Sequence, residues 1–486
     1  MVSVLVAGAG PVGLTMANEL ARYGVSVRIV DTAAQRTDKS KALVLWPRTL
    51  ELLDQAGFVD GFLAGGVQCH GAQISTGQEV IGRPSFDGID SRFPYALMIP
   101  QSETERVLEE QLEKRGVKVE RTVSLERFVD KGGKVEAQLR KAAGGNETLS
   151  ADWLIGCDGA HSTVRHGLGV AFEGTTQLSD WYLADGQISG LPSEDRLYIY
   201  WHKDGILAFF PMGKGRWRMI ADLGPAAGDG RHADPTLEEI QGLISLRGSP
   251  NLAIKDPHWL AAFRINERKV KDYRRGRVFL AGDAAHIHSP AGGQGMNTGM
   301  QDVFNLAWKL SFVVAGACKP SLLDSYSTER SAVGDMVLRN AGRLTDAAIL
   351  RNPILQGIRN TVAKFALGLP LVGHAVANTL AELNIGYPDS PLSTSAGHKA
   401  HGTTPGARWP KRLPIDTGKA RFAAIGPVES VSGLAAKFPN LVQGVPASGH
   451  ADAHNLLLVR PDGYVGFAGA DADQAAAETY LRRLAA

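Results

Sequence analysis

Apolar and polar positions change their spacing twice within the first thirty residues. The apolar run VSVLVAG (2–8) is followed by the helical pattern LTMANELARYG (14–24), and a second apolar run, VSVRIVD (25–31), comes next. Short continuous apolar runs indicate buried strands, whereas apolar positions three and four apart indicate a helix. The pattern therefore predicts a β-α-β unit with parallel strands.

Two further helices are expected before residue 120. The segment PRTLELLDQAG (47–57) starts with Pro47 and ends with Gly57, the usual asymmetry of a helix. The segment QSETERVLEEQLEKRG (101–116) contains Ser102 and Glu105 at capping-box spacing and closes at Gly116. Alternating segments after it predict a β-meander that ends in the buried strand WLIGCDG (153–159).

Residues 172–270 differ in character from this scaffold. Aromatic-rich runs such as RLYIYWH (196–202) and GILAFFPM (205–212) are separated by Gly and Pro. This pattern predicts an antiparallel sheet inserted into the α/β scaffold. We expect the scaffold to comprise 1–75, 96–171 and 271–386, and the inserted domain 76–95 and 172–270.

The most apolar stretch of the second half is TVAKFALGLPLVGHAVANTLA (361–381). It carries Lys364, Pro370 and His374, which a membrane span of about 20 residues would rarely tolerate together. We expect a helical region that packs on the protein and breaks at Pro370. Beyond 386 the chain becomes rich in Pro, Gly and Ser, and 387–486 is predicted to form a small α/β domain.

Composition narrows the functional classes only slightly. The 486 residues are 44% hydrophobic and 21% charged, with a net charge of +2 and no charged block, so nothing favours nucleic acid as a partner. The three cysteines are far apart and match neither a disulfide framework nor a metal site. The first residues resemble a strand more than a signal peptide, and we expect a cytoplasmic protein without a membrane span.

The first glycine cluster has the context of a dinucleotide site. Gly8, Gly10 and Gly13 lie between a predicted strand and a predicted helix, where they permit a tight turn, close approach of a pyrophosphate and close packing. Asp31 ends the second strand, at a distance that suits a ribose hydroxyl. An adenine dinucleotide is therefore expected, the alternative being a glycine turn that serves packing alone.

Two later turns favour FAD over a simple nicotinamide cofactor. CDGAHSTVR (157–165) and GDAAH (282–286) each follow a buried strand. Asp283 can accept hydrogen bonds from the hydroxyls of a ribityl chain. The helix that starts near Gly293–Asn297 can direct its backbone N–H groups at the N1–C2=O region of a reduced flavin.

Together these segments resemble the FAD-dependent aromatic hydroxylases of the para-hydroxybenzoate hydroxylase type, the class A flavoprotein monooxygenases. The matching segments are GAGPVGL, PRTLELL, PQSETERVLEEQL, CDGAHSTVR, YRRGRVFLAGDAAHIHSPAGGQGMNTGMQDVFNLAWKL and LLDSYSTER, in the family's order over residues 1 to about 340. The similarity is greatest to the branch that acts on phenols and polyketides. It implies a glutathione-reductase-like FAD-binding domain, an inserted substrate domain and a thioredoxin-like tail, which here has no cysteine and hence no thiol chemistry.

The resemblance implies a set of cofactor contacts. Asp158 would also lie near a passing nicotinamide, and Lys41 stands where the family commonly has Arg, so its planar fork is missing. The expected FAD-binding residues are Gly8, Gly10, Pro11, Val12, Gly13, Asp31, Lys41, Gln101, Arg106, Asp158, Gly159, Gly282, Asp283, Pro290, Gly293, Gly295, Met296 and Asn297.

The resemblance also implies the reaction: NADPH or NADH reduces the FAD, O2 forms a flavin C4a-hydroperoxide, and a phenolic or polyketide-type ring is hydroxylated. No catalytic base stands out, and the pocket candidates are Trp201, His202, Phe210 and Pro290. His286 and His288 lack a third ligand nearby, so no metal is expected. A monomer or a homodimer is equally compatible.

Three alternatives remain open at this stage. A quinone reductase on the same fold would not couple NADPH consumption to oxygen insertion. A Baeyer–Villiger-type oxygenase would rearrange its product. An aromatic-ligand-binding resistance protein would leave NADPH consumption unstimulated.

Overall fold

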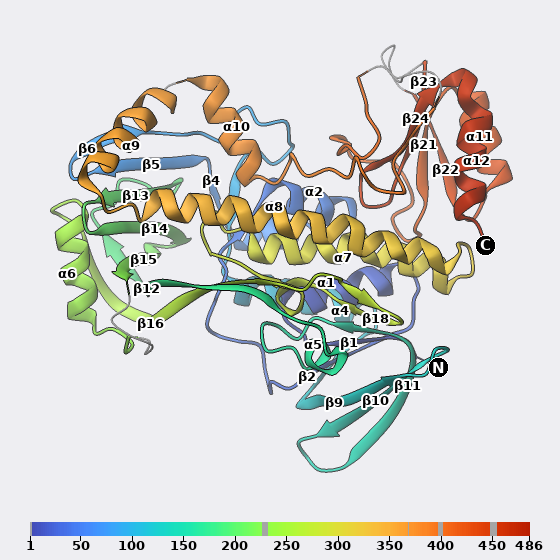
Figure 1. Cartoon of the computed structure of the whole chain (residues 1–486), viewed down its shortest axis with the longest axis horizontal. Coiled ribbons are helices and arrows are strands. Elements are labelled where there is room, and N and C mark those ends of the chain that lie inside the picture. The colour runs from blue at the N-terminus through green and yellow to red at the C-terminus, as the bar shows by residue number, and fades with distance from the viewer. Residues whose placement is uncertain (1, 226–231, 368, 397–401, 448–453) are drawn as a thin grey trace.

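The computed structural model describes residues 2–225, 232–367, 369–396, 402–447 and 454–486. Two long helices, α7 (Gly295–Val314) and α8 (Ser325–Ala348), run side by side through the middle of the molecule (Figure 1). An α/β unit lies below them, an inserted sheet lies at one end and a small α/β unit lies at the other (Figure 1). The mixed α/β architecture is the one that the sequence predicts.

The first sheet has the order β17-β18-β11-β1-β2-β8, and β9 and β10 extend β11. Its central pairs, β11–β18, β1–β11, β1–β2 and β2–β8, are parallel, which confirms the β-α-β unit, and β9–β10–β11 is the predicted meander. Helices α1 and α4 pack together, and α7 packs on α1. The bounds are β1 (Val2–Ala7), α1 (Pro11–Arg22), β2 (Val27–Asp31), α4 (Gln101–Lys114), β8 (Val119–Arg121), β9 (Val123–Asp130), β10 (Val135–Lys141), β11 (Asn146–Gly156), α5 (Thr163–Leu168), β17 (Arg274–Arg275) and β18 (Val278–Leu280).

The expected capping box at the start of α4 is wrong. The helix begins at Gln101 with Pro100 as its N-cap, and no side chain caps it. Ser102 therefore lies within the first turn, where its backbone N–H donates to the hydroxyl oxygen of Ser40 at 3.2 Å. Glu105 accepts instead from the amide of Gln101, at 2.9 Å.

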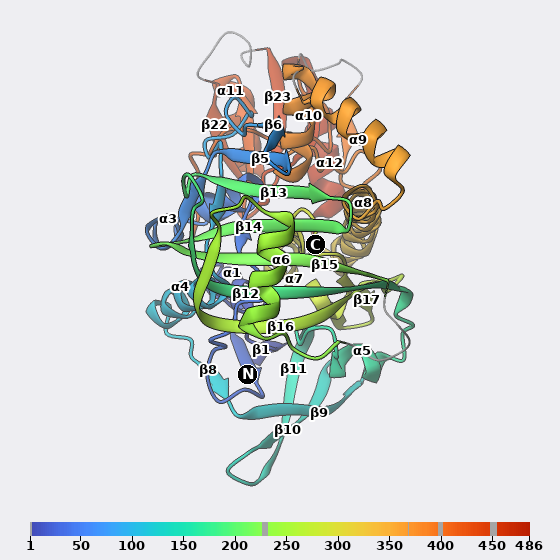
Figure 2. The same ribbon diagram turned by 90° about the vertical axis from the view of Figure 1, so that its left-hand side faces the viewer.

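The second sheet has the order β19-β16-β12-β15-β14-β13-β5-β6 and is covered on one face by α6 (Leu237–Arg247) (Figure 2). It is the predicted inserted sheet, except that β5 pairs with β13 in parallel. This sheet takes in β5 from Gly71, slightly before the predicted boundary, because the chain enters it from the scaffold. The bounds are β5 (Gly71–Thr76), β6 (Glu79–Gly82), β12 (Glu173–Ser189), β13 (Arg196–His202), β14 (Gly205–Gly213), β15 (Arg216–Pro225), β16 (Ala253–Lys269) and β19 (His286–Ile287).

A small sheet and four helices link these parts. The sheet β3-β7-β4 joins the scaffold to the inserted domain through an apolar cluster that contains Trp46, Phe86 and Met98. The break at Pro370 is confirmed, since α9 ends at Ala366 and α10 begins at Pro370. Across the described ranges no helix has the length and apolar character needed to cross a bilayer. The bounds are β3 (Val44–Leu45), α2 (Pro47–Gln55), α3 (Asp60–Gly65), β4 (Val67–Cys69), β7 (Ala96–Met98), α9 (Pro353–Ala366) and α10 (Pro370–Leu380).

The C-terminal unit contains a five-stranded sheet of order β20-β24-β23-β21-β22. Its core is shared with α7, because the rings of Trp308 and Phe422 lie 5.6 Å apart and Phe312 stacks on Phe422. The bounds are β20 (Thr394–Ser395), β21 (Phe422–Gly426), α11 (Val428–Lys437), β22 (Val442–Pro446), β23 (Asn455–Val459), β24 (Val465–Ala470) and α12 (Gln474–Leu484).

Candidate flavin site

Three strand ends meet at one edge of the first sheet. Ala7 lies opposite Gly156, and Gly156 lies opposite Leu280, so β1, β11 and β18 end side by side. Each strand is followed by one of the glycine turns singled out in the sequence. Ligands of parallel α/β sheets bind at this carboxyl edge.

Close backbone packing brings the three turns together. A Cβ at Gly8 would lie 2.4 Å from the carbonyl oxygen of Cys157, and one at Gly299 would lie 2.9 Å from the Cα of Gly282. A Cβ at Gly282 would meet the side chain of Val12 at 2.8 Å. Only glycine fits these positions, and the sequence motifs far apart in the chain thereby form one site.

The first turn leaves the N-terminus of α1 open. A Cβ at Gly13 would lie 1.9 Å from the Gly8 carbonyl oxygen, so turn and helix are in contact, whereas a Cβ at Gly10 would meet nothing within 4 Å. No side chain caps the helix, and its first turn, which starts with Pro11, contains no acid. Uncapped N–H groups beside open space can hold a pyrophosphate.

Asp31 fixes the turn from the end of β2. Its carboxylate accepts from the N–H of Ala9 at 2.6 Å and from the N–H of Ala33 at 2.7 Å. A carboxylate has further lone pairs for a ribose hydroxyl. The side chain thus lies beside the glycine turn, as the spacing predicts.

Asp158 is directed into its own loop. It accepts from the hydroxyl of Ser162 at 2.5 Å and from the N–H of Val164 at 3.1 Å, and so braces the start of α5. Burial raises the pKa of this carboxyl, and these hydrogen bonds oppose the rise. Gly159 follows with a φ of +77°, which turns the chain away from the Gly8 loop.

Asp283 lies differently. Its side chain reaches solvent, yet enough protein surrounds it that burial raises its pKa, while His286 and Lys41 act in the opposite direction. The carboxyl is therefore exposed to solvent and flanked by protein. The structure also brings Lys41, predicted from a distant segment, within electrostatic reach of Asp283.

The start of α7 lines the same region. Gly293, Gly295 and Met296 are partly exposed, and no side chain caps the helix. Asn297 is buried and holds this end in place, because its amide donates to the carbonyl oxygens of Val44 at 2.9 Å and Gly293 at 3.0 Å. The open N–H groups can stabilise an anion.

Sequence reasoning missed Trp46 at this site. Its indole N–H donates to the carbonyl oxygen of Gly292 at 2.8 Å, and its backbone N–H donates to Asn297 at 2.8 Å. Trp46 therefore fixes both the glycine turn and the helix start. The signal was its place at the end of a short apolar run, immediately before Pro47.

Two residues of α4, Gln101 and Arg106, are predicted to contact FAD, and their surroundings differ. Gln101 accepts from the N–H of Ala42 at 3.2 Å and so lies against the segment that carries Lys41. Arg106 is partly exposed and pairs with Glu103 at 2.9 Å and Glu110 at 2.7 Å on its own helix. Its guanidinium is thus engaged by two carboxylates of α4, and its contact with FAD stays a prediction.

The four pocket candidates do not form one group. Phe210 packs against the apolar cluster of Trp46 and Phe86, and Pro290 is exposed beside the turn, where its carbonyl accepts from the N–H of Gly293 at 2.9 Å. Trp201 lies under α9 instead, with the guanidinium of Arg359 4.3 Å from its ring centre.

His202 accompanies Trp201 on β13. Burial lowers its pKa, and its ring nitrogen accepts from the N–H of Asp204 at 3.2 Å. Neither residue belongs to the apolar cluster beside the glycine turn.

A buried ionic chain behind α7 also escaped sequence reasoning. The carboxylate of Asp302 bonds His286 at 2.8 Å and accepts from Arg330 at 2.7 Å. It also accepts from the backbone N–H of Gly282 at 3.0 Å. Despite burial, Arg330 and His286 hold the pKa of Asp302 below its usual range. These ionic contacts hold the Gly282 turn against α7.

His288 stacks on His286, with the two ring centres 6.1 Å apart. Burial lowers the pKa of His288 to about 4, so it is neutral at physiological pH. Among the residues that the structure describes, no group of three His, Cys, Asp or Glu is placed to hold a metal ion.

Together these features form a site that suits a flavin dinucleotide. Two open helix ends, the exposed carboxyl of Asp283 and a cradle that only glycine permits fit the phosphate, ribityl and ring portions of FAD.

Comparison with known proteins identifies the family. The FAD-binding domain family matches residues 1–341, so the chain belongs to it and is an FAD-dependent aromatic monooxygenase. The 6-methylpretetramide 4-monooxygenase of Streptomyces rimosus is 35% identical over 96% of this chain and 90% of that protein.

Two solved structures extend the likeness to the whole fold. The anhydrotetracycline hydroxylase OxyS of Streptomyces rimosus superposes with a TM-score of 0.82 at 30% identity, over 99% of this chain and 98% of the other. CabE, an aromatic hydroxylase from angucycline biosynthesis, gives 0.81 at 30% identity over 100% of both chains.

Proposed function

We propose that the enzyme uses NADPH or NADH and O2 to hydroxylate a multi-ring, polyketide-type phenol. The balanced reaction takes one aromatic C–H, NAD(P)H, H⁺ and O2 to the phenol, NAD(P)⁺ and water. Support comes from the relatives that align along the whole chain, whose names specify polyketide ring systems. When bound, FAD would supply electron transfer and oxygen activation.

The observation that carries the proposal is the opposition of two surfaces at the Gly292–Gly293 turn. On one side are the open start of α7 and the exposed carboxyl of Asp283. On the other side are apolar side chains of the inserted domain and of α10, including Phe210, Met212 and Leu380. An aromatic substrate packed on this wall would lie next to the flavin ring.

The residues then have separate tasks. The Gly10 turn and α1 hold the pyrophosphate, Asp31 and Asp283 accept from the ribose and ribityl hydroxyls, and the start of α7 stabilises negative charge on the ring. Lys41 approaches the cofactor beside Asp283. Arg106 and Asp158 contribute by changing their present partners or by shaping the loops.

We further propose that residues 387–486 form a thioredoxin-like domain without redox chemistry. The topology supports it: β21 and β22 are parallel across α11, and β23 and β24 follow as an antiparallel pair before α12. The segment contains no cysteine. The scaffold and the inserted domain are proposed to divide near residues 75, 95, 171 and 270.

Stopped-flow oxidation of NADPH by the FAD-loaded enzyme tests the function. We expect a multi-ring phenol to accelerate flavin reduction and to gain one oxygen, seen by mass spectrometry. Single-ring phenols of the same acidity are the control for pocket size. Catalytic NADPH oxidation that continues without O2 when a quinone is added as the electron acceptor would instead indicate a quinone reductase, and a ring-expanded product would indicate a Baeyer–Villiger oxygenase.

Replacement of Asp283 tests the cofactor roles directly. Asp283→Asn removes a charged acceptor, and a hydrogen bond to a charged group contributes about 1.5–3 kcal/mol, so FAD affinity should fall roughly 10- to 100-fold. The exposed Asp60→Asn is the matched control. Equal FAD affinity of the two variants by fluorescence titration would contradict the ribityl role.

A further inference from the structure

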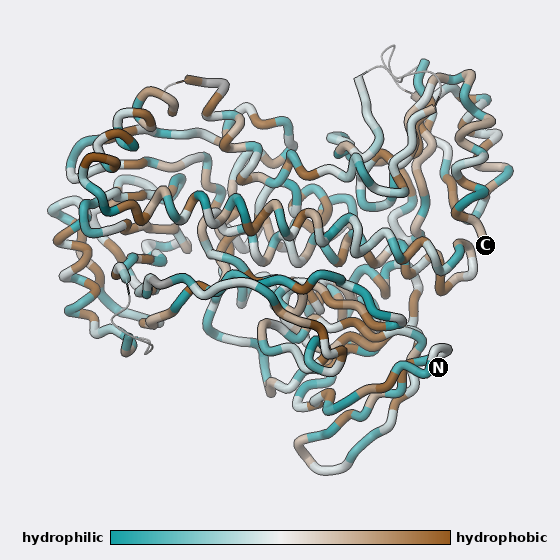
Figure 3. The backbone as a smooth tube through the Cα atoms, viewed as in Figure 1, coloured by the Kyte–Doolittle hydropathy of each residue, from teal (hydrophilic) through white to brown (hydrophobic). Residues whose placement is uncertain are grey.

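Helix α9 has its apolar side toward solvent and its polar side toward the protein. Of its side chains, Ile354 and Phe365 are 75% exposed, Val362 is 59% exposed and Ile358 is 54% exposed. The tube in Figure 3 is brown along much of this outer helix. A surface helix normally shows the opposite arrangement.

The inner side of α9 explains why the helix stays in place. The buried amide of Gln356 donates to the carbonyl oxygens of Lys203 at 3.1 Å and Leu350 at 2.6 Å. Arg359 covers the ring of Trp201 and donates to the carbonyl oxygen of Ala347 at 3.0 Å. Polar contacts therefore anchor the helix on its inner side.

The exposed apolar side chains follow a regular spacing. Leu355, Ile358, Val362 and Phe365 are separated by three, four and three residues. This is the seam spacing of helices that pack lengthwise on another helix. An apolar stripe this narrow suits a helix better than a lipid surface.

The exposed area is large enough to matter. The five side chains from Ile354 to Phe365 leave on the order of 600 Å² uncovered, near the upper limit for a monomer and most of the ~800 Å² that each partner contributes to a standard interface. In both ribbon views α9 lies on the outer rim, where a second molecule can reach it (Figures 1 and 2).

We propose that α9 is a homodimer interface, in which two copies pack antiparallel about a two-fold axis beside Asn360. In this register Leu355 of one copy faces Phe365 of the other, and Ile358 faces Val362. Larger and smaller side chains then alternate, and the stripe is complementary to itself, as a two-fold interface requires.

Charges agree with this partner. Antiparallel helices place the positive end of each dipole beside the negative end of the other. The cations of this region are already engaged within the chain: Lys364 pairs with Glu79 at 2.7 Å and Arg351 with Asp222 at 2.8 Å. They are less available for the headgroups of an anionic membrane.

Sedimentation equilibrium of the FAD-loaded enzyme tests the proposal. We expect a dimer whose dissociation constant rises roughly a hundredfold or more in Ile358→Glu, because each dimer gains two buried, unpaired charges. Leu246→Glu is the matched control, since Leu246 is 57% exposed on α6 and lies outside the stripe. It should leave the dimer unchanged.

A mixing experiment tests the register. Ile358→Glu and Val362→Lys chains should each be monomeric alone, and a one-to-one mixture should form a heterodimer, since the two new charges then face each other. A monomeric wild-type protein, or a dimer that Ile358→Glu does not weaken, would overturn the proposal. So would a monomer that co-sediments with phosphatidylglycerol vesicles, which would assign the stripe to a membrane surface.

Discussion

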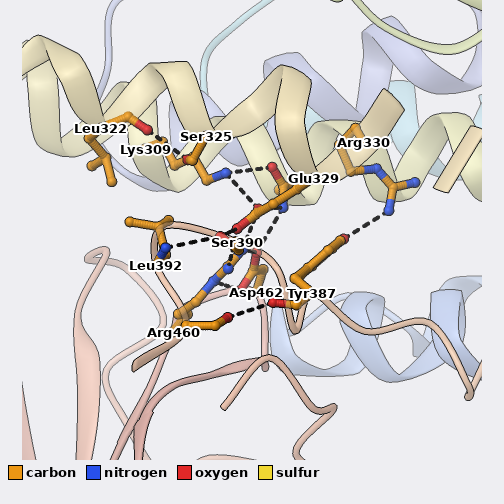
Figure 4. A network of polar contacts seen from close by, with 12 residues as sticks. Lys309, Leu322, Ser325, Glu329, Arg330, Tyr387, Ser390, Leu392, Arg460 and Asp462 are labelled. Carbon is orange, nitrogen blue, oxygen red and sulfur yellow. Dashed lines mark hydrogen bonds and ion pairs between the residues drawn. The ribbon is translucent and has the colours of Figure 1, made fainter. Parts of the chain in front are cut away.

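Two regions beside helix α8 depart from the usual rule that charged side chains are exposed and apolar side chains are buried. They depart from it in different ways. Where the C-terminal unit meets α7 and α8, Lys309, Glu329, Arg460 and Asp462 are all buried (Figure 4). Where the chain leaves α8 and continues into α9, apolar side chains are exposed instead. One region buries charge and the other exposes hydrocarbon.

The buried charges are tolerated because each has partners. Arg460 bonds Glu329 at 2.6 Å and Asp462 at 2.5 Å, and Lys309 bonds Glu329 at 2.8 Å. Burial opposes ionisation of Glu329, but Arg460 and Lys309 hold its pKa below the usual range. Burial lowers the pKa of Lys309 to about 8.

The difference shows that a buried contact is stable when each group in it has a suitable partner, whether the groups are charged or apolar. The charged junction is complete within one chain and joins the C-terminal unit to the flavin helix. The apolar stripe on α9 is one surface of an interface, and the proposed second surface is the same stripe on another copy of the chain. We expect substitutions at the junction to affect folding, and those on the stripe to affect association alone.

The largest expected effect comes from breaking the junction. Arg460→Ala leaves Glu329 and Asp462 buried with one cation fewer and should lower the free energy of unfolding by roughly 3–5 kcal/mol. Urea unfolding followed by tryptophan fluorescence is suitable, because Arg460 lies 5.3 Å from the ring of Trp308.

An exposed ion pair provides the control for that experiment. Arg140 pairs with Glu126 at 3.0 Å with most of its side chain in solvent, and Arg140→Ala should cost less than about 1 kcal/mol. Equal losses in the two variants would mean that burial of the junction charges has no energetic consequence.

A second experiment uses Glu382, a buried acid that pairs with no Lys or Arg among the residues that the structure describes. Glu382 accepts from Thr298 at 3.0 Å and from Gln301, and its φ is +58°. Burial raises its pKa to about 8, although Thr298, Arg330 and Gln301 act in the opposite direction. It is therefore mostly protonated in the folded protein at neutral pH.

The sign of the pH effect follows from that raised pKa. Above about pH 4.5 the unfolded chain releases this proton while the folded chain keeps it, so stability falls as pH rises, by up to about 1.4 kcal/mol per unit until about pH 8. Glu382→Gln has no proton to lose at this position. At pH 8 its free energy of unfolding should therefore exceed that of the wild type by on the order of 1–3 kcal/mol. The exposed Glu429→Gln should show no such pH-dependent difference.

The smallest effect is expected on the stripe in the monomer. Ile358→Ser removes an apolar side chain that contacts solvent, so unfolding of dilute monomer should change by no more than about 0.5 kcal/mol. Thermal unfolding at low protein concentration measures this. A loss of several kcal/mol would mean that Ile358 packs within its own chain.

Much of the cofactor half followed from sequence because its signals are local. Gly8 and Gly13 are required by close backbone contacts, and Gly282 by its positive φ and by the side chain of Val12, so these positions are visible as glycines in the sequence. Apolar runs likewise predicted the central strands. The capping box at Ser102 failed because Pro100 sets the helix start one residue before it.

Partners distant in the chain were beyond sequence reasoning. Nothing local indicates that Trp46 bonds Gly292 or that Arg460 crosses to Glu329. The sequence by itself determined the glycine cradle, the parallel sheet and the inserted domain, since each depends on residue type and spacing. Only the tertiary structure decided which charges are buried together and which face of α9 remains uncovered, because burial and pairing depend on what the rest of the chain brings alongside.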